Sequence, residues 1–247
     1  AAISCGSAYP TLPFALVTAN HSGGRLLVAQ ALRNGNTQQN DICVTRLNAD
    51  GSRDSTFGTG GQTVMSDVQF GAYFPFKILV RSDQAIQLLL LDAPQKRLHR
   101  PALLWLTSNG LPDTTRGPQG IVHPMSSRIN SITAATLQAD DKLLLAGYPA
   151  RLDFGVATVD ESAPRVGRQA ASGSGADFNF GPLGDGYVAL LTGGERIVPN
   201  DIVATADGSI YVAGGIGAAS GTTTTMAVAR LIGDTAAPPA GNNSGGG

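Results

Sequence analysis

The chain has 247 residues and a net charge of −1, which gives no electrostatic case for binding nucleic acid or an anionic membrane. Charged residues make up 14% of it, with 2 Glu and 3 Lys against 16 Asp, 32 Gly and 14 Pro. Because Glu and Lys fill exposed helix faces while Asp and Gly favour turns, this composition predicts almost no helix. No apolar run is long enough for a membrane-spanning helix.

Short runs rich in Val, Ile, Leu and Thr, bounded by Gly, Asn, Asp or Pro, predict a chain of β-strands. In chain order these strands are residues 14–18, 25–30, 42–47, 62–65, 76–80, 86–91, 102–106, 121–123, 132–137, 142–146, 155–159, 166–170, 202–205, 210–213 and 226–231. The first three units of this pattern have four strands and the last has three. The N-terminal segment, residues 1–9, is a candidate for the missing strand.

A polar turn that leads into an apolar strand occurs four times. The steps from Gly23 to Asp83, from Asp83 to Asp140 and from Asp140 to Asp207 are 60, 57 and 67 residues. A period of this size is typical of stacked repeats, in which each unit buries its faces against its neighbours. Asp140, and the Asp207-Gly208 pair, stand where a tight turn is required.

The second strand of each unit is apolar almost throughout, as at residues 88–91 and 143–146. Since a sheet with one wet face alternates, continuous apolarity indicates that both faces are covered. These features predict an all-β fold, a β-propeller of four-stranded antiparallel blades. Residues 171–199 are interpreted as a degenerate fifth blade, with four blades or an open stack as alternatives. Residues 1–234 are expected to form this single domain, and residues 235–247 a flexible tail.

The corner that follows the third strand, residues 46–61, resembles the signature of the delta-60 repeat family of bacterial proteins. The residues of the corner that carry the resemblance are Asp50, Gly51, Asp54 and Phe57. The second unit keeps a worn form of this corner, and the third has residues 160–164 in its place. The resemblance implies tandem β-repeats in an exported, propeller-like protein, and it implies no activity because the shared residues form turns.

The final residues, 244–247, look like the start of the Gly-Gly sorting signal of some proteins exported by Gram-negative bacteria. A plain linker is the alternative. The expected location is therefore secreted, periplasmic or at the cell surface of a Gram-negative bacterium. Cys5 and Cys43 are expected to form a disulfide, which suits an oxidising compartment, while a buried thiol at Cys43 is the other interpretation.

Few residues suggest a ligand site. The densest basic stretch is a candidate anion-binding loop or else a solvated hairpin tip, and consists of Lys96, Arg97, His99 and Arg100. Asn48, Asp50, Ser52 and Asp54 alternate oxygen ligands as calcium loops do, although turn formation explains the same residues. No catalytic residue, cofactor or metal site is assigned.

The leading hypothesis is a non-enzymatic exported scaffold that binds a protein or glycan through loops at one end of the propeller. One alternative is a structural module of a surface-anchored or filamentous assembly. Another is a hydrolase or lyase with a site on the central channel, for which Asp201 is one conceivable carboxylate. Whether the protein is an enzyme is therefore left open, and the sequence favours a non-enzymatic role.

Overall fold

The computed structural model describes residues 15–33, 40–66, 73–92, 101–123, 129, 131–153, 156–159, 164–173, 175–192, 195–217 and 223–232. The prediction of an all-β fold is confirmed, because the only helical segments in these ranges are two three-residue 3₁₀ turns, η1 (Ser22–Gly24) and η2 (Pro118–Gly120). Neither of these described turns has the length or apolar character of a membrane-crossing helix.

Four antiparallel sheets of four strands each follow one another along the chain. The first contains β1 (Ala15–His21), β2 (Arg25–Arg33), β3 (Asn40–Leu47) and β4 (Gln62–Met65). The second contains β5 (Tyr73–Val80), β6 (Ile86–Asp92), β7 (Ala102–Leu106) and β8 (Ile121–Val122). The third contains β9 (Ser131–Leu137), β10 (Leu143–Tyr148), β13 (Arg165–Gln169) and β14 (Tyr187–Ala189). The fourth contains β15 (Leu191–Thr192), β16 (Glu195–Ala204), β17 (Ser209–Gly217) and β18 (Thr223–Ile232).

The apolar second strands are buried on both faces, as their composition predicts. In β6, Leu88 and Leu90 belong to the core between the first and second sheets, whereas Leu89 and Leu91 belong to the core between the second and third. Successive side chains of a strand point to opposite faces, so that one continuous leucine run supplies two cores. Burial of each leucine stabilises the fold by roughly 1.5–3 kcal/mol.

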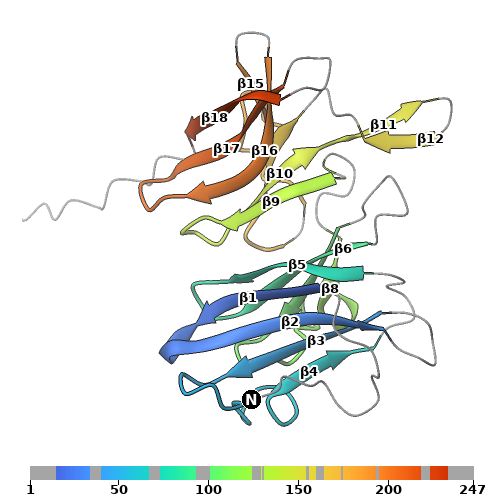
Figure 1. The fold of residues 1–247 in the computed structure, drawn as a ribbon, viewed down its shortest axis with the longest axis vertical. Helices are drawn as coiled ribbons and strands as arrows, with labels where there is room; N and C mark the ends of the chain where they lie inside the picture. Colours follow the sequence, from blue (N-terminus) through green and yellow to red (C-terminus); the bar gives the residue numbers. More distant parts are fainter. Residues whose placement is uncertain are drawn as a thin grey trace, which may run out of the picture.

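The described sheets form an open stack. One apolar core joins the first and second sheets, a second joins the second and third, and a third joins the third and fourth. No hydrophobic core of described residues joins the fourth sheet to the first. Figure 1 shows these two sheets, coloured blue and orange to red, at opposite ends of the long axis. Residues 1–9, the candidate closing strand, lie outside the described residues.

The blade count and the third unit differ from the sequence interpretation. Four four-stranded sheets are present in the described chain, which is the alternative blade count, and the described part of residues 171–199 forms no separate blade. A two-stranded hairpin, β11 (Ala150–Asp153) with β12 (Val156–Val159), is inserted between the second and third strands of the third sheet. Residues 155–159 therefore do not supply the third strand, which is β13. Because of this insertion, the last strands of the third unit come later in the sequence than the repeat period predicts. In the sequence they therefore resemble an extra blade.

Candidate functional site

Three corners with the same backbone geometry follow the third strands β3, β7 and β13. In each, a strand carbonyl accepts the amide of an aspartate eight or nine residues later: Arg46 from Asp54 (2.9 Å), Trp105 from Asp113 (2.9 Å) and Arg168 from Asp177 (2.8 Å). The third corner is thus at residues 168–181, and its prediction at residues 160–164 is wrong. The third corner lies further along the chain because the hairpin is inserted before β13. The turn of the third corner also lacks the Asp-Gly pair that marks the first corner.

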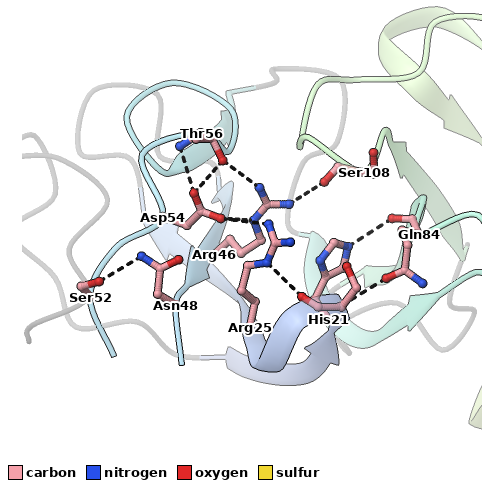
Figure 2. A network of polar contacts seen from close by, with 10 residues as sticks. His21, Arg25, Arg46, Asn48, Ser52, Asp54, Thr56, Gln84 and Ser108 are labelled. Carbon is pink, nitrogen blue, oxygen red and sulfur yellow. Dashed lines mark hydrogen bonds and ion pairs between the residues drawn. The ribbon is translucent and has the colours of Figure 1, made fainter. Parts of the chain in front are cut away.

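The aspartate of the first corner is the centre of a polar network (Figure 2). The Asp54 carboxylate lies 2.8 Å from Arg46 Nε and 3.3 Å from Arg25 Nη1, and the Thr56 hydroxyl and amide both donate to it. The Thr56 hydroxyl bond, followed by the Thr56 amide bond and then the nearby Arg46 charge, holds the pKa of Asp54 well below its ordinary value against the opposing effect of burial. Asp54 is therefore an ionised, buried acceptor that fixes the conformation of the corner.

Arginines connect the first corner to the second sheet and the second corner to the third sheet. Arg46 stacks over Phe57, with 4.8 Å between its guanidinium carbon and the ring centroid, and its Nη1 donates to the Ser108 carbonyl of the second sheet (2.6 Å). Arg116 donates in the same way to the Ser172 carbonyl of the third sheet (2.8 Å). Each bond satisfies a turn carbonyl with a permanent cation, so that the three corners form one continuous edge, called here the corner end.

Aromatic side chains pack across the same boundaries, against glycines of the next turn. A Cβ atom built on Gly110 would lie 2.5 Å from the Phe57 ring, and one built on Gly173 would lie 2.5 Å from the Trp105 ring. Both glycines also have positive φ, at 82° and 83°. Trp105 is buried, and the guanidinium carbons of Arg81 and Arg116 lie 5.1 and 4.6 Å from its ring centroid.

The third corner repeats the first with the same residue types. Arg168 Nε lies 3.0 Å from the Asp177 carboxylate, and Lys142 Nζ lies 3.3 Å from it. The Arg168 guanidinium also stacks over Phe180 at 4.6 Å. The arrangement Arg–Asp–Phe therefore recurs at two of the three corners, with Trp105 in place of the arginine at the second.

The turns between first and second strands lie at the same end. Asp140 accepts from the Lys142 amide (3.3 Å) and Asp207 from the Ser209 amide (3.1 Å), while Gly208 has φ of 83°. A bond from the Thr205 hydroxyl is the main cause of the lowered pKa of Asp207. These aspartates close their own turns, as Asx turns do.

A model of a β-propeller family, described as a domain of unknown function (DUF5122), matches residues 24–57. That stretch runs from the first hairpin turn through β2 and β3 to Phe57 of the first corner. The fold is that of a β-propeller. No curated protein matches the chain. A solved structure titled polysaccharide lyase Uly1 is similar at 10% identity and a TM-score of 0.38, covering 88% of this chain. The chain spans 57% of that structure, and the likeness is too low to carry an argument about activity.

The propeller does not assemble the calcium ligands that the sequence pattern indicates. Asp50 accepts from the Ser52 amide and hydroxyl (2.8 and 2.6 Å), and the Asn48 amide donates to the Ser52 hydroxyl (3.0 Å). Asp54 is paired with two arginines instead. Among the described residues, no group of three or more His, Cys, Asp and Glu side chains is placed to hold a metal ion.

Several residues that the sequence marks as candidate sites are not part of the corner end. Cys43 is buried in β3, but Cys5 lies outside the described residues, and the disulfide stays a prediction. The candidate anion loop, Lys96, Arg97, His99 and Arg100, and the tail at residues 235–247 also lie outside them. Asp201 is exposed on the outer face of the fourth blade, where its carboxylate accepts from the Ile202 amide (2.9 Å).

Three large apolar side chains at the corner end had no signal in the sequence. Leu111 is exposed on the turn of the second corner, Phe178 on the third corner, and Leu183 in the turn that follows the third corner. The Asp177 carboxylate accepts from the Asn179 amide (3.1 Å), which fixes the backbone on both sides of Phe178. The repeat pattern marks the position of Phe180, which packs inward, but gives Phe178 no role.

Proposed function

We propose that this propeller is a non-enzymatic, exported scaffold that binds a protein or glycan partner through the corner end. The observation that carries the proposal is the exposure of Leu111, Phe178 and Leu183 on loops of neighbouring blades. Exposed apolar side chains that gather on one part of a surface mark interaction sites. An exposed aromatic ring suits either a protein contact or the apolar face of a sugar.

The rigidity of the corner end supports a binding role. The backbone that carries these side chains is fixed by the Arg168–Asp177 pair and by the bond from Arg116 to the Ser172 carbonyl. A surface that is already ordered loses less conformational entropy when a partner binds. Loops held on a stable scaffold are the common location of binding residues.

The carboxylates at this end are better suited to structure than to proton transfer. Hydroxyl bonds lower the pKa values of Asp50, Asp54, Asp113 and Asp207, with Ser52, Thr56, Thr115 and Thr205 as the respective donors. A general acid or base works best when its pKa lies near the working pH. Export draws its support from the predicted Cys5–Cys43 disulfide, which an oxidising compartment would maintain.

Binding can be tested with a glycan array and with affinity capture from the producing cells, each followed by titration of the identified partner. The double variant Phe178→Ser, Leu183→Ser is expected to weaken binding by about tenfold or more, since buried aromatic contacts dominate many interfaces. Met226→Ser, on the outer face of the fourth blade, is the control and should bind normally. Equal affinity of the double variant and the wild type, or turnover of a glycan by the wild type, would refute the proposal.

A further inference from the structure

The outer face of the fourth blade is exposed where the matching face of every other blade is buried. The third strand of each blade has an apolar residue at the same position, two residues before Arg46, Trp105, Arg168 or Arg230. In chain order these apolar residues are Val44, Leu103, Val166 and Val228. The first three are 0% exposed, whereas Val228 is 64% exposed. Met226, Leu191 and Val203 are exposed around it. This face therefore has the composition of a blade interface without a described neighbour.

In the other blades, the first strand of the following blade provides the cover. β5 lies against β1, β2 and β3 of the first blade, and β16 lies against β9 and β10 of the third. The periodic packing thus defines what fits the face of the fourth blade: the first strand of another blade, packed at the spacing of sheet on sheet.

The hydrogen bonds described for Arg230 also lack the acceptor on a following blade that Arg46 has. Arg46 donates across the blade boundary to the Ser108 carbonyl of the next turn. Arg230 is exposed, and the hydrogen bonds described for it run to the Ser209 hydroxyl within its own blade (2.9 and 3.2 Å). A turn carbonyl of another blade would complete the pattern.

The first blade presents the complementary half of this contact. Its turn is the counterpart of those at Gly110 and Gly173, but a Cβ built on Gly51 meets nothing within 4 Å, where the other two meet Phe57 and Trp105. Leu16 and Thr18 of β1 are also exposed, although Val28 of β2, which pairs with Thr18, is already buried. The free area of the first blade is therefore its first strand and its turn, the parts that a following blade uses.

We propose that copies of this chain associate head to tail, with β1 and the turn at residues 48–52 of one copy packed on the outer face of the fourth blade of another. Arg230 then donates to the turn carbonyls and lies near Asp50, whose carboxylate complements its charge. Such a contact joins two different surfaces, so it closes into a ring or continues as a filament, depending on the rotation between copies.

Sedimentation velocity of the whole chain over a wide concentration range tests the association. The wild type is expected to form dimers or longer oligomers as concentration rises. Met226→Asp should weaken the association by about tenfold or more, because it places a carboxylate in an apolar contact. His123→Asp is the control, since His123 is exposed at the end of the second blade, which takes part in neither half of the proposed contact. A wild type that stays monomeric throughout would overturn the proposal.

A charge exchange distinguishes head-to-tail packing from a contact of two identical faces. Arg230→Asp alone and Asp50→Arg alone should each weaken association, by placing like charges opposite one another. An equal mixture of the two variants should associate again, because one contact regains Arg230 with Asp50 and the other has the exchanged pair. If the mixture stays as weak as the single variants while all of them remain folded by circular dichroism, the head-to-tail arrangement is wrong.

Discussion

Single residues at the blade boundaries decide how tightly the blades fit. Gly51 and Gly110 are equivalent and have nearly equal φ of 80° and 82°, but Phe57 of the neighbouring blade lies only against Gly110. Gly51→Ala should cost about 1 kcal/mol from the left-handed backbone alone. Gly110→Ala should cost a further 1–3 kcal/mol or so from overpacking against the ring.

Urea unfolding of these two glycine variants measures both free energies. Because the backbone contribution is common to the pair, the difference isolates the packing between blades. Equal losses of stability would show that Phe57 gives way to a methyl group and that the boundary is loosely packed.

The buried ion pair of the first corner should matter more than its exposed counterpart. Asp54→Asn leaves the Arg46 guanidinium, 2% exposed, without its carboxylate, which should cost about 3 kcal/mol. Asp113→Asn removes a pair with Arg116 whose side chains are 24% and 29% exposed, and should cost less than about 1 kcal/mol. Thermal unfolding of both variants is the measurement, and a larger loss for Asp113→Asn would contradict this order.

His21 gives the protein a dependence on pH below neutrality. Burial, opposed by the bond to the Gln84 carbonyl, lowers the pKa of His21, and Arg46 and Arg25 lower it further while Asp54 raises it. The unfolded chain therefore binds a proton at about pH 6.5, where the folded protein does not, and stability should fall as pH decreases below that value.

The His21→Gln variant tests this assignment. Glutamine can still donate to the Gln84 carbonyl but does not titrate, so the loss of stability between about pH 7 and about pH 5 should be smaller than in the wild type. Chemical unfolding at the two pH values gives the comparison. An unchanged pH dependence would assign the effect to other groups.

At the scale of elements, the β11–β12 hairpin is predicted to be dispensable. It forms a sheet of its own and pairs with no strand of the third blade, whose β10 and β13 already pair from Gly147↔Arg165 onward. Replacing residues 149–163 by Asn-Gly would close those strands with a two-residue turn. The melting temperature should stay within a few degrees of the wild type. Loss of cooperative unfolding would show that the hairpin supports the blade.

Sequence patterns predicted the regular units well and the interrupted one poorly. In the first two units the apolar runs and Asp-Gly-type turns agree with the strands, because burial on both faces imposes a recognisable composition. In the third unit the insertion breaks the period, and the corner that begins at Arg168 has no Asp-Gly pair. The exposure of Phe178 and Val228 was beyond prediction, since it depends on which neighbour covers each position and not on local pattern.

At the scale of the whole molecule, the predicted Cys5–Cys43 disulfide would tie the N-terminal segment to β3. A bridge that closes a loop of this length should stabilise the fold by about 3–4 kcal/mol on the chain-entropy estimate. Intact mass before and after reduction detects the bond, and Cys5→Ser should lower stability by a similar amount in oxidising buffer. The same stability for Cys5→Ser and the wild type would show that Cys43 is a buried thiol.

The bond from Arg46 to the Ser108 carbonyl, 62 residues further along the chain, has a consequence during synthesis. At ribosomal speed this acceptor emerges about 3–12 s after the arginine. Until then Arg46 Nη1 has only water as an acceptor, while Nε and Nη2 already donate to Asp54 and Thr56 of the same unit, so the contacts of that unit stay incomplete. The contacts of one blade are thus completed only when the next blade has been synthesised, so that folding proceeds from the N-terminus toward the C-terminus.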